Sequence, residues 1–235
     1  MSQPKLLVNA FIAVCLVAVW GGVAWRYCGP VQPLTEAEVD RYLSLFTRHM
    51  MEVGIPDGEP EASLKQSLAE LRHFAETDDG KPFYMINLMR WREQAVFREG
   101  IAGVEGVDVQ EADRLYNEKL FMELLGNASH TAYLSSTLPN ALNLGVSGAA
   151  DHWGEVGIFR YSSRRDFFNM VSSDSYKDIM IYKMASMRDI ALVPSQPHGL
   201  LFNPMPNIPV LLAAVFIIFY LLSVVVQLWS LARKA

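Results

Sequence analysis

Cysteine is almost missing from this chain, since Cys15 and Cys28 are the only two and both lie near the N-terminus. Residues 29–235 therefore contain no thiol, which excludes a disulfide framework and cysteine-based catalysis from most of the chain. The two cysteines cannot pair within one chain. A helix would hold them roughly 20 Å apart, whereas a disulfide requires Cα atoms less than about 7 Å apart.

Motifs that bind nucleotides or metals, or that activate a serine, are also missing. The chain has no G-x-G-x-x-G, no phosphate-binding loop and no nucleophile elbow. Its five histidines show neither H-x-H nor H-x-x-x-H spacing. We therefore expect no cofactor and no metal, and we interpret His130 and His152 as surface or capping residues rather than as haem or metal ligands.

Charge is absent from two long runs, Leu6–Trp25 and Ile208–Ala232. Each run has about 20 residues or more, enough for a helix to cross a hydrocarbon core of about 30 Å. The first run is longer than the apolar part of a signal peptide and is followed by no A-x-A cleavage site. We predict transmembrane helices over residues 6–26 and 208–232, with the lipid bilayer as a partner.

The residues between the two runs are acidic. Residues 27–207 hold 16 Lys and Arg and all 25 Asp and Glu, a net charge of −9. Such a charge repels nucleic acid and anionic lipid, so we expect no nucleic-acid partner and a domain outside the bilayer. Arg233 and Lys234 favour a cytoplasmic C-terminus, although Arg26 favours the reverse. We predict a two-pass protein of the cell (inner) membrane, with both termini cytoplasmic and a periplasmic or extracytoplasmic central domain.

Two amphipathic helices are predicted directly after the first run. Thr35 and Glu38 have the spacing of a capping box, and the apolar residues of Val39–Val53 share one helical face. A second apolar face extends over Leu64–Ala75. We expect residues 27–80 to form a linker and a two-helix stalk.

Residues 81–197 alternate between strand and helix patterns. Strands are predicted at Phe83–Trp91, His130–Leu138, Trp153–Tyr161 and Ile190–Val193, and helices at Glu111–Leu125 and, with a pause at SSDS, from Phe167 to Met187. In the first helix, Leu115, Met122 and Leu125 are expected to face inward. The β-α-β-β-α-β order predicts an α+β, ferredoxin-like domain whose helices lie on one face of the sheet. A proline-rich linker, residues 198–207, follows it.

The first predicted strand is apolar at nearly every position, which indicates that both of its faces are covered. Helices on one face leave the other face open. A second copy of the same sheet, closing a barrel across a two-fold axis, would cover it. We therefore expect a homodimer, or a partner in a membrane complex.

Several motifs of this domain resemble a known family. FYMINLMRWR, Tyr116 and WGEVGIFRYSSRRDFFNMVSSDSYKDIMIYKMASMRDIAL together resemble an uncharacterised bacterial domain family of the dimeric α/β-barrel (ferredoxin-like) superfamily. Asn87 and Arg90 match its first motif, Tyr161–Arg164 the second and Asp174–Tyr176 the third. The resemblance covers about half of the chain and implies this fold and dimerisation.

The superfamily resemblance implies a pocket between sheet and helices but not a reaction. Relatives include cofactor-free monooxygenases, lactone isomerases and haem-dependent peroxidases, and a shared fold does not transfer chemistry. The chain also departs from the family, because Tyr182 and Lys183 stand where members often carry a His-Arg pair. A function that relies on that histidine is therefore not expected.

Eight residues are candidates for lining such a pocket. They are Asn87, Arg90, Tyr116, His152, Trp153, Tyr161, Tyr176 and Arg188. Arginine and tyrosine suit an anionic or phenolic ligand, and tyrosine or histidine can move a proton. The alternative is structural: Trp153, Tyr161 and Tyr176 pack in the core, while Arg90 and Arg188 pair with carboxylates.

Two functions fit these observations. The first is a membrane-anchored, non-catalytic accessory or assembly subunit of a larger membrane complex, which the two anchors and the lack of a catalytic set favour. The second is a cofactor-free enzyme, similar to a monooxygenase or isomerase, or a binder of small lipophilic or aromatic ligands. The superfamily resemblance and the candidate residues favour the second.

Overall fold

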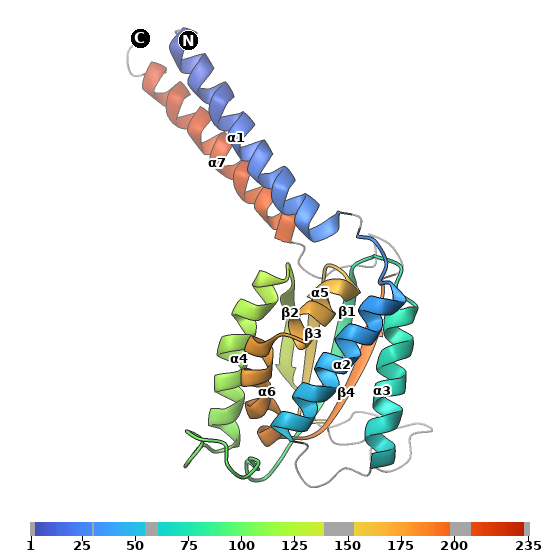
Figure 1. The fold of residues 1–235 in the computed structure, drawn as a ribbon. Helices are drawn as coiled ribbons and strands as arrows, with labels where there is room; N and C mark the ends of the chain where they lie inside the picture. The colour runs from blue at the N-terminus through green and yellow to red at the C-terminus, as the bar shows by residue number, and fades with distance from the viewer. Residues whose placement is uncertain (1–2, 30, 55–60, 139–152, 198–207, 233–235) are drawn as a thin grey trace. The chain divides into compact units, whose positions relative to one another are not determined.

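The computed structural model describes residues 3–29, 31–54, 61–138, 153–197 and 208–232. The chain divides into two compact units (Figure 1). One unit comprises residues 1–29 and 204–235, and the other comprises residues 30–203.

The first unit consists of two apolar helices that contact each other, α1 (Gln3–Cys28) and α7 (Ile208–Ala232). The Nε1 atom of Trp20 donates a hydrogen bond of 2.8 Å to the carbonyl oxygen of Pro209. Both helices are long and apolar enough to cross a membrane, and very little of either spanning window is buried. Apolar side chains that face outward along a whole helix suit hydrocarbon and not water.

The second unit contains five helices and four strands among its described residues. They are α2 (Glu36–Val53), α3 (Glu61–Glu76), β1 (Phe83–Trp91), α4 (Val109–Gly126), β2 (His130–Ser136), β3 (Glu155–Tyr161), α5 (Arg164–Val171), α6 (Asp174–Ser186) and β4 (Met187–Ser195). The strands form one sheet in the order β2-β3-β1-β4, and all neighbours are antiparallel. The unit is therefore α+β.

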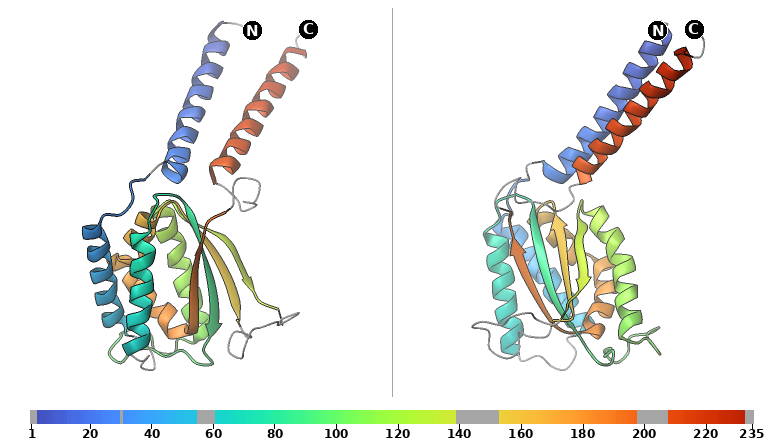
Figure 2. Two further views of the ribbon diagram at one scale, coloured as in Figure 1. Left: turned by 90° about the vertical axis from the view of Figure 1, so that its right-hand side faces the viewer. Right: turned by 180° about the vertical axis from the view of Figure 1, so that it is seen from behind.

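All five helices of this unit lie on one face of the sheet (Figures 1 and 2). Their apolar sides meet alternate residues of the strands in one core, where Phe83 of β1 stacks on Tyr161 of β3 with ring centroids 5.2 Å apart. Phe167 and Phe168 complete the centre of this core. We call this side of the sheet the covered face.

The helices α2 and α3 belong to this core. Val39 and Leu43 of α2 are buried, and Tyr42 stacks on Phe168 with ring centroids 5.7 Å apart. Residues 30–203 form one compact unit. The two-helix segment expected as a stalk is therefore part of the domain, because its apolar stripe is buried against α5 and α6.

No described helix of this unit packs on the opposite face of the sheet (Figure 2), although Tyr84, Arg160 and His130 at one end of this face are buried. The strand registers place Ile86 and Leu88 of β1 beside Ile158 and Val156 of β3 on this side, with Val193 of β4 opposite Ile86. The first four are half-buried and Val193 is 46% exposed. We call this side, with its apolar centre, the open face.

Local signals set several boundaries as the sequence predicts. Thr35 and Glu38 form a capping box at the start of α2, and β1 has the predicted limits. The pause predicted at SSDS separates α5 from α6, whose N-cap is Ser173. The last strand is longer than predicted, because pairing with β1 extends it over Met187–Ser195.

The inward face predicted for α4 is wrong at Met122 and Leu125, whereas Leu115 is half-buried. Met122 is 66% exposed and Leu125 is 39% exposed, whereas Tyr116, Leu120 and Leu124 are buried. The buried residues recur every four positions and form the stripe that packs on α6 and the sheet. His130 is also buried, at the start of β2, and is not a surface residue.

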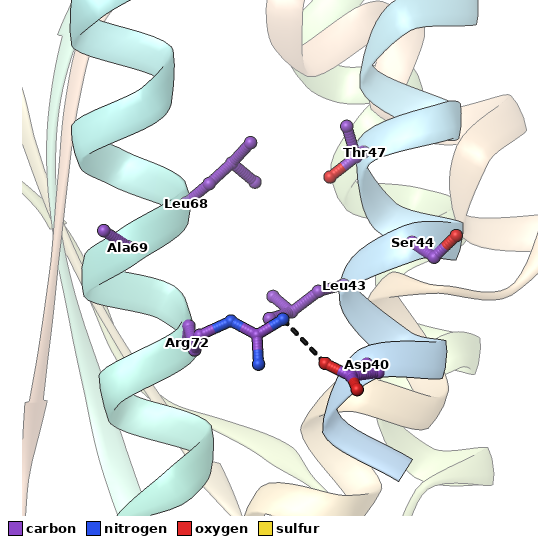
Figure 3. Close-up of a pocket in the computed structure, with 7 residues that line it drawn as sticks. All are labelled: Asp40, Leu43, Ser44, Thr47, Leu68, Ala69 and Arg72. Atoms are coloured by element: carbon purple, nitrogen blue, oxygen red, sulfur yellow. Dashed lines mark hydrogen bonds and ion pairs between the residues drawn. The ribbon is translucent and has the colours of Figure 1, made fainter. Parts of the chain in front are cut away.

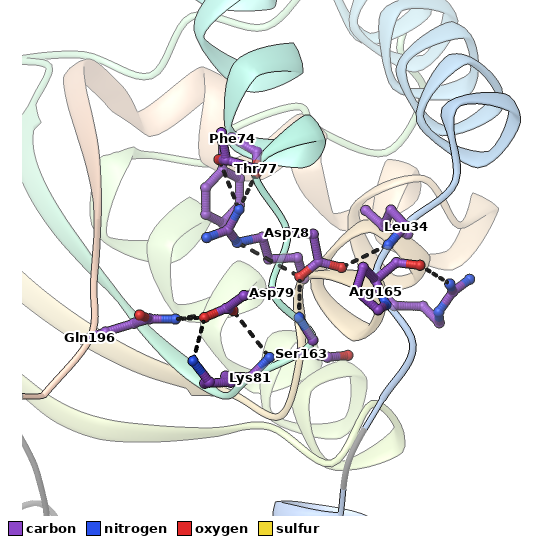
Figure 4. Close-up of polar contacts among 12 residues, drawn as sticks. Leu34, Phe74, Thr77, Asp78, Asp79, Lys81, Ser163, Arg165 and Gln196 are labelled. Atoms are coloured by element: carbon purple, nitrogen blue, oxygen red, sulfur yellow. Dashed lines mark hydrogen bonds and ion pairs between the residues drawn. The ribbon is translucent and has the colours of Figure 1, made fainter.

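Both chain ends of this domain are fastened at the turn between α3 and β1 (Figure 4). The backbone N–H of Leu34 donates to Asp78 at 3.0 Å, and the side-chain amide of Gln196 donates to both oxygens of Asp79 at 3.2 Å. Gly80 has φ +70°, and a Cβ there would lie 2.0 Å from the carbonyl oxygen of Val31. The segments that lead to and from the apolar helices are thus held at one site.

Candidate functional site

A group of polar side chains is buried between the covered face and the helices α4 and α6. It consists of Tyr116, Tyr161, Tyr176 and Lys183, each no more than 6% exposed. The Nζ atom of Lys183 lies 3.3 Å from the hydroxyl of Tyr116, which lies 3.4 Å from the hydroxyl of Tyr176. We call these four residues the lysine–tyrosine cluster.

Helical spacing explains how this cluster forms. Tyr176 and Lys183 are seven residues apart, so they lie on the same side of α6 two turns from each other. Tyr116 belongs to the buried stripe of α4, which packs against α6. Its ring also lies beneath the ammonium group, with Nζ 5.0 Å from the ring centroid. The lysine thus meets the tyrosine through both the hydroxyl and the aromatic face.

Burial dominates the electrostatics of the three tyrosines. It raises the pKa of Tyr116 well above the ordinary value, and the neighbouring hydroxyl of Tyr176 adds to this. Burial likewise raises the pKa values of Tyr161 and Tyr176. All three are therefore neutral at physiological pH and keep their protons available for donation.

Burial has the opposite effect on the lysine. It lowers the pKa of Lys183 to about 8, although the nearby carboxylates of Asp113 and Glu155 act to raise it. Burial raises the pKa values of both carboxyls, and Lys183 partly offsets this. Asp113 and Glu155 are only half-buried. The cluster therefore has one margin near solvent, and that margin carries acidic groups.

Asn87 faces the same side of the sheet as Tyr161. It is 5% exposed, and its Oδ1 atom is buried with no hydrogen-bond partner within the described residues. A buried acceptor without a donor costs roughly 1–3 kcal/mol. An unused acceptor on the covered face is a place where a ligand donor can bind.

The eight predicted pocket residues do not form one site. Tyr116, Tyr161 and Tyr176 come together in the cluster, and Asn87 shares the covered face. Arg90 instead pairs with Asp189 at 3.1 Å and lies over the ring of Trp153, 5.6 Å from its centroid.

Arg188 and His152 are the two remaining candidates. The Arg188 side chain is 65% exposed, with its Nε atom 3.8 Å from Asp189. The two candidate arginines therefore share one carboxylate, as the structural alternative predicts. His152 lies outside the described residues.

Lys183, Asp113 and Glu155 are not among the site residues that the sequence predicts. The one available signal was that Lys183 stands where the resembling family often has an arginine. Its spacing of seven from Tyr176 also fits one face of a helix. Asp113 and Glu155 carry no comparable signal, since acidic residues on amphipathic helices and at strand ends are usually solvated.

Two further features are relevant to ligands. No group of three or more His, Cys, Asp or Glu side chains that could hold a metal ion occurs in the described ranges. A groove of about 490 Å³ lies between α2 and α3 (Figure 3), with Leu43 and Leu68 in its wall and the Asp40–Arg72 ion pair at 2.7 Å across it. This groove contains none of the predicted pocket residues.

Comparisons with known proteins give no family for the chain. No family model matches, and no curated protein matches. A protein of unknown function from Rhodopseudomonas palustris is 18% identical with a TM-score of 0.46, covering 60% of this chain and 96% of that one. The methylated form of that protein is 20% identical with a TM-score of 0.47, covering 62% of this chain and 98% of that one. A protein from Arabidopsis thaliana is 7% identical with a TM-score of 0.32, covering 50% of this chain and 97% of that one.

Proposed function

We propose that this chain is a two-pass membrane protein that serves as a non-catalytic accessory or assembly subunit of a larger membrane complex. Its α1 and α7 helices cross the inner membrane, and residues 30–203 form an extracytoplasmic domain. The domain pairs with a second copy, or with another subunit, through the open face. The observation that carries this proposal is a sheet face with an apolar, half-buried centre on which no described helix of the domain packs.

The finer fold assignment within this proposal is a ferredoxin-like domain of the dimeric α/β-barrel type. The strand order β2-β3-β1-β4, the antiparallel pairing and the single helical layer support it. The family resemblance of Asn87, Arg90 and the Asp174–Tyr176 segment supports it independently. In this type of assembly, two sheets bury their open faces against each other.

The chemistry of the open face favours a protein partner over water. Its centre is aliphatic in all of its central pairs, such as Ile86 with Ile158 and Leu88 with Val156. Such a patch marks an interaction site in a soluble domain. The polar cross-strand pair of Arg90 with Asp189 lies towards one end of β1. An apolar centre with polar residues around it is the usual composition of an interface.

The test is native mass spectrometry of the full chain extracted in a mild detergent. We expect a homodimer bound to further subunits. Leu88→Asp and Val193→Asp should reduce the dimeric or assembled fraction at least tenfold, because each buries a charge in the interface. Met122→Asp on the outer face of α4 is the matched control and should leave assembly unchanged. A lone monomer from the wild-type protein would contradict the pairing, and a lone homodimer would contradict the accessory role.

Orientation needs its own experiment. Protease added to the outside of spheroplasts should degrade the domain of residues 30–203 and leave a tag at either terminus intact. Cleavage of the terminal tags with protection of the domain would reverse the proposed topology.

A second function is favoured by a specific observation, the lysine–tyrosine cluster with the unpaired acceptor of Asn87. In this view the domain is a cofactor-free enzyme, or a binder of small lipophilic or aromatic molecules that partition from the bilayer. The same mass spectra should then show a retained small molecule. Tyr176→Phe should weaken its retention, whereas Tyr133→Phe on the open face should not.

A further inference from the structure

We propose that Lys183 is a nucleophilic amine that forms an imine with small, uncharged aldehydes or ketones. This inference rests on the second function above, since it assumes that a small molecule reaches the lysine–tyrosine cluster. It adds a substrate class and a covalent step that neither the fold nor the resemblance implies.

The geometry places a proton donor beside the amine. The Nζ atom of Lys183 lies 3.3 Å from the hydroxyl of Tyr116, and the hydroxyl of Tyr176 lies 3.4 Å beyond it. A carbonyl carbon at bonding distance from Nζ would bring its oxygen within reach of the Tyr116 hydroxyl. A positioned nucleophile with an adjacent acid is the arrangement that covalent catalysis requires.

The surroundings of the amine increase its reactivity. Lysine is a weak nucleophile while it is protonated, and desolvation in an apolar site lowers its pKa and frees the lone pair. With the pKa lowered to about 8, roughly a tenth of the Lys183 amines are neutral at pH 7, against less than about a thousandth for an ordinary lysine. The carboxyl groups that act on it are Asp113 of α4 and Glu155 of β3, and its hydroxyl neighbour is Tyr116 of α4. Tyr161 of β3 and Tyr176 of α6 in turn act on Tyr116.

The same groups define the substrate class. Asp113 and Glu155 are half-buried, so the margin of the cluster that is nearest to solvent carries two carboxyl groups. An anionic keto acid would be repelled there. The tyrosine rings and the apolar core around them favour an uncharged, apolar carbonyl compound, such as the short aldehydes that dissolve in lipid.

The proposed step conserves atoms and needs no oxidant or reductant. The neutral amine of Lys183 attacks the carbonyl carbon, a C–N bond forms, and the carbonyl oxygen takes the proton of the Tyr116 hydroxyl. The nitrogen returns a proton to the Tyr116 oxygen, which gives a neutral carbinolamine. A second proton passes from Tyr116 to the carbinolamine hydroxyl, water leaves, and the nitrogen loses its last proton to Tyr116. The sum is amine plus carbonyl to imine plus water.

The experiment is reductive trapping in the full chain in mild detergent. The protein is incubated with propanal at pH 7, sodium borohydride is added, and peptide mass spectrometry measures alkylation of each lysine. We expect Lys183 to be alkylated at least tenfold faster than Lys81, which is exposed. Pyruvate should trap at least tenfold less than propanal. Tyr116→Phe should slow trapping at Lys183 several-fold without affecting Lys81.

The comparison with Lys81 lies within one protein, so no variant has to fold for the test to be decisive. Alkylation of Lys183 no faster than that of Lys81 would overturn the inference. Equal trapping by pyruvate would overturn the substrate class. If trapping fails while native spectra retain a small molecule that Tyr176→Phe releases, the imine is wrong and the binding function stands. If both fail, the second function is wrong as well.

Discussion

The two faces of the sheet are made by the same strands and yet have opposite environments. On β1, Phe83 and Met85 point to the covered face and are 1% and 4% exposed. Ile86 and Leu88 alternate with them, are equally apolar, and are only half-buried. A strand that is apolar on both sides therefore has helices on one side, whereas on the other side Tyr84 is buried and Ile86 and Leu88 have no helix packed on them.

The two faces show that some apolar residues of the sequence are matched by contacts within the chain and others are not. The covered face is determined within the chain, because α2 to α6 supply the apolar surface that it requires. The apolar centre of the open face indicates a partner other than this chain, because no described helix supplies apolar surface against it. The polar groups also differ between the two faces. The lysine–tyrosine cluster is enclosed by the covered face, whereas Arg90 and Asp189 pair on the open face.

Phe83→Ala on the covered face and Leu88→Ala on the open face should show the largest difference in the free energy of unfolding. Phe83 contacts three aromatic rings and is fully buried, so its truncation should lower the free energy of unfolding by about 3–5 kcal/mol. Leu88→Ala should cost about 1 kcal/mol when the chain is dilute enough to be monomeric. Denaturant unfolding of the full chain in detergent, followed by circular dichroism, measures both.

Protein concentration sharpens this comparison. If copies pair as proposed, the cost of Leu88→Ala should increase at high protein concentration, since the proposed interface would bury that side chain, while the cost of Phe83→Ala should not change. If Leu88→Ala costs as much as Phe83→Ala in the monomer, the open face is covered within the chain and the proposed interface is wrong.

Prediction from sequence succeeds where local signals are strong. The limits of β1 are correct because a continuous apolar run of β-forming residues is bounded by a turn signal at Asp79-Gly80 and by charge after Trp91. The start of α2 is correct because Thr35 and Glu38 satisfy each other's backbone groups.

Prediction fails where the sequence offers two equivalent choices. In α4 one apolar stripe contains Met122 and another contains Tyr116 and Leu120, and only packing on α6 selects the second. Lys183 is missed for a related reason. Hydrophobic periodicity treats a lysine as an outward residue, whereas here its charge is enclosed beside Tyr116.

Replacing the enclosed charge should stabilise the covered face. The pKa of Lys183 is about 8 in the folded chain and 10.5 ordinarily, so the unfolded chain binds more protons between these values. Stability then increases as pH rises from about 8 to 10.5, and the charged amine costs up to about 3 kcal/mol at pH 7. Lys183→Met should raise the free energy of unfolding at pH 7 by about 1–3 kcal/mol, after loss of its hydrogen bond to Tyr116.

The control for this prediction is Lys81→Met, because that lysine is 72% exposed and pairs with Asp79 at the surface. It should change stability by less than about 1 kcal/mol and keep the rise between pH 8 and 10.5. Lys183→Met should remove that rise. A wild-type stability that stays flat over this range would show that the amine is not enclosed as described.

A smaller gain is expected from Asn87→Leu, also on the covered face. Leucine fills a similar volume and removes the buried oxygen that has no partner within the described residues, so stability should increase by about 1 kcal/mol. Asn117→Leu is the matched control, because its amide donates to Asp113 at 2.7 Å and its loss should destabilise. If both variants destabilise equally in thermal unfolding, the Asn87 oxygen is satisfied and offers no ligand site.

The smallest effect should come from Arg90→Met, the open-face counterpart of Lys183→Met. The Arg90 side chain is 21% exposed and Asp189 is 46% exposed, so water screens their 3.1 Å ion pair. Such a pair contributes at most about 1 kcal/mol, and methionine keeps the apolar stem that lies over Trp153. A double-mutant cycle with Asp189→Asn should give a coupling below about 1 kcal/mol in the monomer. A coupling that grows several-fold when copies pair would place this ion pair inside the interface, where loss of water strengthens it.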